Sequence, residues 1–146
     1  MKFRKILVPT DFSPVGEPAL EVATSLARDN DAKLVIMHVH EPPIEYGGGE
    51  MYYGVQETDR DELRKMLCEI APTDQVVYSR KLVVGDPIEA IIQVAESEKV
   101  DLIVMGTHER RGLQRLLGSV SEAVVRRAKC PVLTVKQPAA VLAEAL

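Results

Sequence analysis

Polar side chains follow three apolar runs of the sequence, at 9–13, 39–41 and 106–121. The third segment is the longest, and it combines the cation Arg110 with Gly118-Ser119 ahead of a helical pattern. Guanidinium groups and the free N–H groups at the start of a helix both hold anions, so this segment favours phosphate. Glycines also end strands and serines also cap helices, which leaves a purely structural role open. The phosphate site is therefore a hypothesis at this point.

Other chemistries find less support in the spacing. His38 and His40 share one face of a predicted strand, but no second group of ligands accompanies them, so a packed, hydrogen-bonded His38 is favoured over a metal site. Asp11 could accept a phosphoryl group as response-regulator receivers do, but the paired acids and the lysine that serve such a site are missing, and a simple turn role stays open. No serine lies in a Gly-x-Ser-x-Gly elbow. Cys68 and Cys130 are interpreted as buried thiols.

The composition is typical of a globular protein. Of the 146 residues, 46% are hydrophobic and 27% are charged, and a net charge of −4 gives no excess of cations for nucleic acid or an anionic membrane. Residues 110–136 do hold seven cations and one acid, although a solvated helix face explains them as well. No apolar run approaches the ~18 residues that cross a bilayer, and no export signal is apparent. We expect a cytoplasmic protein without a membrane or nucleic-acid partner.

The hydrophobic pattern predicts the elements that position these residues. Short apolar runs indicate buried strands, and a periodicity of 3.6 residues indicates helices between them. We expect strands at 5–9, 33–39, 76–84, 100–105 and 131–135, and helices at 17–28, at 59–70, from Pro87 onward and around 120–128. Asp86 is the expected N-cap of the helix that starts at Pro87. Residues 41–54 have the composition of an irregular loop with a glycine hinge.

Strands that alternate with helices require right-handed crossovers and give a parallel sheet with helices on both faces. The sequence therefore predicts a doubly wound α/β domain. Ligands of such sheets bind outside the carboxyl ends of the strands, at the point where the strand order reverses. This rule selects the same three segments, of which 106–121 carries the anion-binding residues.

Several motifs resemble those of the universal stress protein family. They are Ile6-Leu7-Val8-Pro9-Thr10-Asp11-Phe12-Ser13, the strand end His38-Val39, the element Val84-Gly85-Asp86-Pro87, the stretch from Asp101 to Gly118-Ser119-Val120, and Cys130-Pro131-Val132-Leu133-Thr134-Val135. Their order and spacing cover nearly the whole chain. We expect a domain of this family over residues 1–137, followed by a C-terminal tail at 138–146.

The resemblance implies a fold, a dimer and a ligand. Proteins of this family adopt a five-stranded parallel sheet of order 3-2-1-4-5 and commonly dimerise through the last strand, here from Val132 to Lys136. Some members bind ATP and others do not. By this resemblance, ATP with a bridging Mg²⁺ would bind at Pro9, Thr10, Asp11, Val39, Met105, Gly106, His108, Arg110, Gly118, Ser119, Val120 and Ser121.

The phosphate end departs from the pattern of the nucleotide-binding members, which is Gly-x2-Gly-x9-Gly-[Ser/Thr]. Glu109 stands where the second glycine is expected, and only eight residues separate it from Gly118. A carboxylate there repels phosphate, and its Cβ opposes a left-handed backbone at a cost of roughly 1 kcal/mol or more. Within a helix, one missing residue rotates all later residues by about 100° relative to the earlier ones. The adenosine half of the pattern is intact.

Three functions are consistent with these observations. The first is a homodimeric stress-response module that binds ATP or a related adenine nucleotide and signals through its bound state. The second keeps the fold and the dimer without a nucleotide, and uses Arg110, Arg111 and Arg115 for an unidentified protein partner. The third is slow ATP hydrolysis, although no residue marks a catalytic base; phosphate release that disappears in Asp11→Ala would reveal it.

Overall fold

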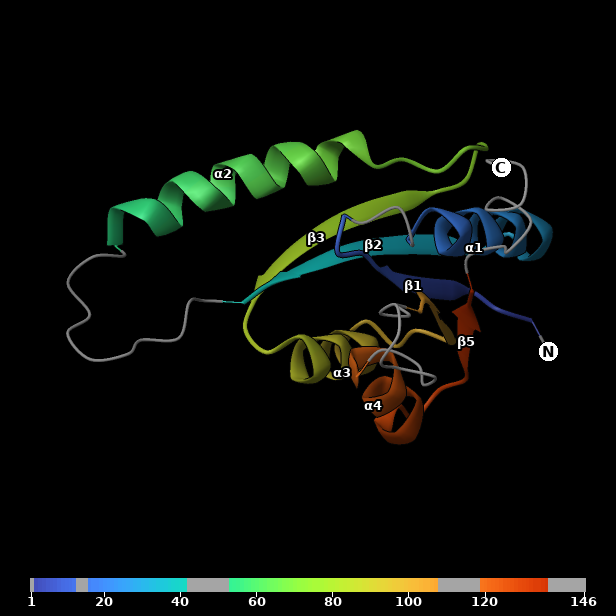
Figure 1. Cartoon of the computed structure of the whole chain (residues 1–146). Helices are drawn as coiled ribbons and strands as arrows, with labels where there is room; N and C mark the ends of the chain where they lie inside the picture. The colour runs from blue at the N-terminus through green and yellow to red at the C-terminus, as the bar shows by residue number, and fades with distance from the viewer. Residues whose placement is uncertain (1, 13–15, 42–52, 108–118, 137–146) are drawn as a thin grey trace, which may run out of the picture.

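The chain folds around one five-stranded parallel sheet with helices on both faces (Figure 1). The computed structural model describes residues 2–12, 16–41, 53–107 and 119–136, without the side chains of 16, 53–59 and 119. The elements are β1 (Lys5–Pro9), α1 (Gly16–Asn30), β2 (Lys33–His40), α2 (Tyr53–Glu69), β3 (Tyr78–Val84), α3 (Pro87–Ser97), β4 (Leu102–Gly106), α4 (Ser119–Arg127) and β5 (Val132–Val135). The strand order β3-β2-β1-β4-β5 confirms the predicted doubly wound α/β fold.

The three central strands form because their side chains are apolar on both faces of the sheet. Ile6, Leu7 and Val8 of β1 are at most 2% exposed. Residues 34–37 of β2 and 102–105 of β4 repeat this burial. Runs of this kind suit parallel strands that helices cover on both sides, and they place the three strand ends that matter for the site next to one another.

A stripe of alanines holds α1 against one face of the sheet. Ala19, Ala23 and Ala27 are four residues apart, so they share one side of the helix, and all three are buried. They pack in one core cluster with Ile6 and Val104 of the sheet. Methyl side chains let the helix lie close to β1 and β4, while α2 lies over the same face beside β3 (Figure 1).

α3 starts where the sequence predicts. The Asp86 side chain accepts a hydrogen bond from the Glu89 N–H at 3.0 Å, and Pro87 occupies the first turn, which confirms the predicted N-cap. Gly85 has a φ of +153°, a conformation that side chains disfavour, so a glycine suits the turn from β3 into α3. The buried side of α3, including Ile91, packs with α4 over the second face of the sheet (Figure 1).

Two predictions about α2 and the thiols are wrong. α2 begins at Tyr53, whereas the sequence predicts a loop as far as residue 54 and a helix only from residue 59. The helix extends further because residues 55–58 contain no helix breaker and a glycine is tolerated in a first turn. The rest of that loop, 42–52, lies outside the described residues. Cys68 is exposed rather than buried, because Leu67 alone is buried among the described side chains of α2. Cys130 is half-buried, and that burial raises the pKa of its thiol.

One carboxylate links the end of α3 to two strands. The Nζ atom of Lys81 on β3 lies 3.0 Å from a Glu98 carboxylate oxygen, and that of Lys5 on β1 lies 3.2 Å from the other. These two ammonium groups hold the pKa of the Glu98 carboxyl below its usual range, and Lys81 has the larger effect of the two. A group with a lowered folded-state pKa contributes stability above its unfolded pKa and loses that contribution as the pH falls.

We expect Glu98→Gln to lower the free energy of unfolding by about 0.5 kcal/mol near neutral pH, because both pairs are partly exposed to solvent. The difference from the parent should shrink as the pH falls below the ordinary carboxyl pKa of about 4.3 and through the lower pKa of Glu98 in the folded protein, where the carboxylate takes up a proton. Urea unfolding at neutral and acidic pH measures both values. Glu96→Gln is the control, because its partner Lys129 is 81% exposed. A difference that is unchanged at acidic pH contradicts this account.

Candidate functional site

A cavity of about 390 Å³ opens at the carboxyl ends of β1, β2 and β4. Its volume lies within the range of small-molecule sites, which is roughly 300–1,000 Å³. Apolar side chains form much of its wall, with a few polar groups among them. The lining residues are Pro9, Thr10, Asp11, His38, Val39, His40, Glu41, Pro87, Ile91, Met105, Gly106, Val120 and Ser121.

The position of the cavity follows from the strand order. From β1 the chain winds through β2 to β3 on one side of the sheet, and then crosses to β4 and β5 on the other. β1 pairs with β2 as far as Pro9 opposite Met37, whereas its pairing with β4 stops at Leu7 opposite Ile103. The two strands therefore leave a crevice between their ends, where doubly wound folds bind ligands.

β2 extends beyond β1 and turns main-chain groups toward the cavity. The Thr10 N–H donates to the Met37 carbonyl at 2.8 Å, so Met37 directs its main-chain groups toward β1. The Gly85 N–H donates to the His40 carbonyl at 3.0 Å, so His40 directs its groups toward β3. Because these directions alternate along a strand, the N–H and C=O of Val39 face the side of β1, which has already ended. Val39 thus presents a donor and an acceptor side by side.

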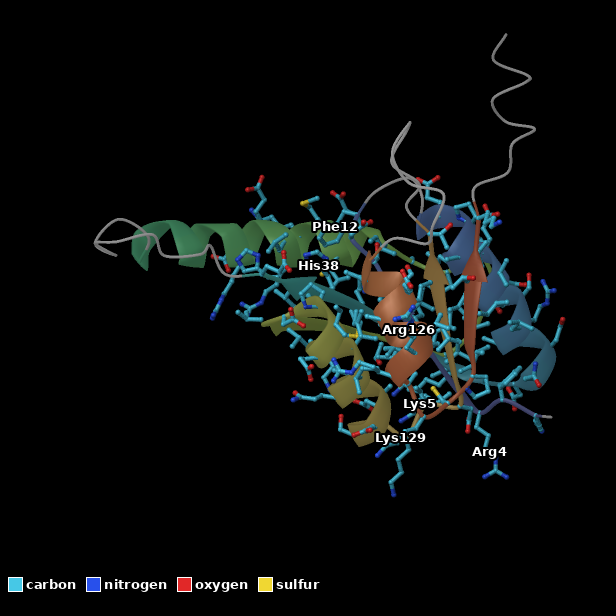
Figure 2. The ribbon with its side chains drawn as sticks, turned by 60° about the horizontal axis from the view of Figure 1, so that its bottom comes forward. Arg4, Lys5, Phe12, His38, Arg126 and Lys129 are labelled. Carbon is cyan, nitrogen blue, oxygen red and sulfur yellow. The ribbon has the colours of Figure 1, made fainter. Side chains whose placement is uncertain are left out.

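Asp11 lies in a turn that contacts β2 on both sides of it. The Thr10 carbonyl lies 2.7 Å from His38 Nδ1, and the Phe12 N–H donates to Thr10 Oγ1 at 3.1 Å. The ring centroids of Phe12 and His38 are 4.2 Å apart, and Figure 2 shows the two side chains next to one another. These contacts confirm that His38 is packed and hydrogen-bonded. Asp11 itself is exposed and lines the cavity.

Phe12 adopts a backbone conformation that costs energy. Its φ is +67°, in the left-handed region, where a residue with a Cβ loses about 1 kcal/mol relative to glycine. Such conformations persist when the surrounding structure holds them, and they gather at functional sites. Among the described residues, the hydrogen bond to Thr10 and the ring contact with His38 both support Phe12 in this conformation.

The start of α4 closes the cavity on the side of β4. Val120 and Ser121 line it, and the buried Ser121 hydroxyl donates to the Gly106 carbonyl at 3.1 Å. The first N–H groups of a helix lack partners within the helix and can hold an anion. Because a hydroxyl has one proton and that of Ser121 is engaged, the main chain of α4 is better placed to donate to an anion than this side chain.

Three cations on or next to α4 are already paired. Arg127 lies 2.6 Å from Glu89 and holds the pKa of that carboxyl below its usual range, and Arg126 lies 2.8 Å from Glu122. Lys129 pairs with a glutamate of α3, and Figure 2 shows it pointing away from the end of the molecule that carries His38. The cation predicted at the phosphate end, Arg110, lies outside the described residues.

The structure brings most of the predicted binding residues together. Eight of the twelve line the cavity: Pro9, Thr10, Asp11, Val39, Met105, Gly106, Val120 and Ser121. Ser119 begins α4, but its side chain is not described. His108, Arg110 and Gly118 lie outside the described residues. Contact with a nucleotide stays a prediction for all twelve.

The twelve predicted binding residues omit five residues of the cavity wall, namely His38, His40, Glu41, Pro87 and Ile91. His40 and Glu41 lie within the predicted segment 39–41, and His38 lies directly before it. The other two belong to the first turns of α3, whose start the sequence does predict. Since that helix follows β3 and crosses back over the sheet, its N-terminus could have been added to the site from topology alone.

Within the described ranges, no group of three His, Cys, Asp or Glu side chains could hold a metal ion. None of the helices in the described part of the chain is long and apolar enough to span a membrane. The site consists of a partly apolar cavity, the main-chain edge of β2, the carboxylates of Asp11 and Glu41, and the start of α4.

Comparisons with known proteins agree with this architecture. The sequence model of the universal stress protein family matches residues 2–136. The universal stress protein MJ0531 of Methanocaldococcus jannaschii is 36% identical over 143 residues, covering 93% of this chain and 84% of its own. The structure of universal stress protein UspA from Lactobacillus plantarum superposes with a TM-score of 0.75 at 24% identity, covering 92% of this chain and 99% of its own. A universal stress protein in complex with cAMP gives a TM-score of 0.61 at 28% identity, covering 92% and 98%. The chain belongs to the universal stress protein family.

Proposed function

We propose that the protein binds an adenine nucleotide, ATP first among them, in the cavity at the ends of β1, β2 and β4. The observation that carries the proposal is the donor and acceptor pair that Val39 directs toward the cavity. The adenine would lie against Val39, the ribose at Asp11, and the phosphates toward the start of α4. The protein would act as a binding module in the cytoplasm, where ATP is made and used, and a partner protein would respond to its bound state.

The base end of the cavity suits adenine. Along its Watson–Crick edge, adenine carries the acceptor N1 beside the amino group at C6, which is a donor. The Val39 N–H can donate to N1 while the Val39 carbonyl accepts from the amino group, as adjacent strands pair. The side chains of Ile91, Met105 and Val120 supply apolar wall for the faces of the ring. A relative in this fold is in complex with cAMP, which contains the same base.

The phosphates would lie at the start of α4. There, beside Gly106, helix N–H groups can hold an anion. His108, Arg110, Gly118 and Ser119 would add contacts by the family pattern, and Glu109 opposes them. Mg²⁺ would arrive with the phosphates, because phosphate oxygens and water are its usual ligands in nucleotide sites.

We also propose that the protein is a homodimer through the last strand, from Val132 to Lys136. β5 lies at the edge of the sheet, so one side of its main chain has no neighbouring strand among the described elements. Its Leu133 side chain is 39% exposed. Free strand edges with apolar side chains favour pairing with a second chain.

The test of the nucleotide site is a calorimetric titration of the nucleotide-stripped protein with ATP, with and without Mg²⁺. Nucleotide that co-purifies with the protein is assayed in parallel, and released phosphate is measured in the same samples to detect slow hydrolysis. Binding at micromolar concentration or tighter supports the proposal. No heat at millimolar ATP, together with no co-purified nucleotide, would overturn it and direct attention to a protein partner.

Asp11→Ala should weaken ATP binding by about 10- to 100-fold, because a hydrogen bond to a carboxylate is worth about 1.5–3 kcal/mol. Asp11→Asn should lose less, since the amide retains one acceptor oxygen. The titration above measures both constants. Asp61→Asn on α2 controls for the change in net charge, because Asp61 is exposed and is not a lining residue of the cavity. Equal affinities for the parent and Asp11→Ala would remove Asp11 from the site.

A further inference from the structure

The turn that carries Asp11 depends on one side chain of the neighbouring strand. His38 of β2 contacts the residue before Asp11 through a hydrogen bond to the Thr10 carbonyl, 2.7 Å from Nδ1. It contacts the residue after Asp11 through the Phe12 ring, with the centroids 4.2 Å apart and the planes inclined by 34°. Both chain neighbours of Asp11 thus contact the same imidazole ring.

The hydrogen bond defines which nitrogen carries the proton. A main-chain carbonyl only accepts, so His38 Nδ1 must donate to Thr10 O. A side chain without a donor at this position leaves the Thr10 carbonyl without that partner. The phenylalanine side chain would keep a ring against Phe12 and lose the donor, whereas the asparagine side chain would keep a donor near Nδ1 and lose the ring.

Phe12 needs that support because of its backbone. With a φ of +67°, it reverses the chain directly after Asp11, and its N–H donates to Thr10 Oγ1. A residue with a side chain leaves this conformation readily unless contacts hold it. If Phe12 relaxed, the carboxylate of Asp11 would change direction at the mouth of the cavity.

His38 is also the neighbour of Val39 along β2. Successive side chains of a strand point to opposite faces, so the His38 ring contacts the turn after β1 while Val39 packs on the core beneath α3 and α4. One short strand end therefore carries both the main-chain edge proposed for the base and the side chain that supports Asp11.

We propose that His38 is the positioning residue of the site. It holds Asp11 at a fixed position relative to Val39, so that the contacts to the ribose and to the base form together. The inference rests on the proposed function. His38 acts through Asp11 and the main chain, and its loss should weaken recognition of the ribose selectively. Preorganised contacts of this kind strengthen binding by reducing the ordering that the ligand must impose.

The test compares ATP with 2′-deoxy-ATP and 3′-deoxy-ATP in the parent, His38→Phe, His38→Asn and Asp11→Ala. The parent should prefer ATP over one deoxy analogue by about tenfold or more, and Asp11→Ala should lose that preference. His38→Phe should reduce the preference to about threefold or less, and His38→Asn should keep an intermediate value through its amide donor. The ratio of ATP to AMP affinity, which reports the phosphate end, should be unchanged in all variants. An unaltered ribose preference in His38→Phe overturns the inference.

A second measurement needs no nucleotide. Hydrogen exchange at the Phe12 amide should accelerate about tenfold or more in His38→Phe, because the turn opens more often. Ala27→Gly in the buried stripe of α1 is the control: it destabilises the fold far from the turn and should leave the Phe12 amide close to the parent rate. If the parent fails to bind ATP, the proposed function fails, and this exchange rate still decides the role of His38. Equal rates in His38→Phe and Ala27→Gly would overturn it.

Discussion

GTP and ITP should bind at least about thirtyfold more weakly than ATP, because both bases carry N1–H and O6 where adenine carries N1 and an amino group. Against Val39, the N1–H would face the main-chain N–H, and O6 would face the main-chain carbonyl. Each buried group that loses its partner costs about 1–3 kcal/mol, and two such groups give a factor of about thirty to about twenty thousand. Competition titrations with all three triphosphates measure the ratio directly.

Two controls separate the main-chain contact from general fit. Val39→Ala should retain the preference for ATP over ITP, because the discriminating groups belong to the backbone. Purine riboside triphosphate, which lacks the amino group and keeps N1, should fall between ATP and ITP. GTP binding within about threefold of ATP would mean that the edge of β2 does not distinguish the base.

The preference has its origin in a difference of strand length. β1 ends at Pro9, opposite Met37, while β2 continues through His40, so three residues of β2 extend beyond their neighbour. The hydrophobic pattern predicts both strands and nearly both ends, but it contains nothing about how the two strands are offset. Register depends on contacts between segments that lie about 28 residues apart, which local propensity does not describe.

Local signals predict what depends on local physics. The buried run Ile6-Leu7-Val8 requires a strand because it is too short for a helix, and Asp86 before Pro87 requires a helix start. Predicted and observed element boundaries differ where the local signals are weak. β3 begins at Tyr78 rather than at the predicted Val76, and the Val77 side chain before it is 69% exposed rather than packed in the core.

The site shows the same division between local and long-range information. Asp11 and Gly106 are predictable because each follows a buried strand in a doubly wound sheet, and strand ends meet at one edge. The family resemblance adds Val39. The bond between His38 and Thr10 and the left-handed backbone of Phe12 are not predictable in this way, because both arise only when β2 pairs with β1. Both features lie directly beside Asp11 in the chain.

Truncation of the central core should have the largest effect on stability. Ile103 of β4 is fully buried in the cluster that α3 and α4 cover, so Ile103→Ala should lower the free energy of unfolding by about 4 kcal/mol. That is a large part of the roughly 5–15 kcal/mol typical of a whole domain. Ile103→Val, which removes one methylene, should lose only about 1 kcal/mol. Urea unfolding followed by circular dichroism measures both. A loss below about 1.5 kcal/mol for Ile103→Ala would mean that neighbouring side chains fill the space.

Ile103→Ala also tests whether core packing and ligand binding contribute independently to the free energy of unfolding. ATP at a hundredfold excess over its dissociation constant should add about 2.7 kcal/mol to the free energy of unfolding, in the variant as in the parent. Ile103 lies three residues before Gly106 and is not a lining residue of the cavity, so the strand end and the α4 start should keep their geometry. Equal gains in the two proteins would show that burial beneath the sheet and ligand contacts at its edge contribute independently. A gain confined to the parent would show instead that the packing of β4 sets the position of the nucleotide, because a methyl-sized shift of that strand would then reach Gly106 and the start of α4.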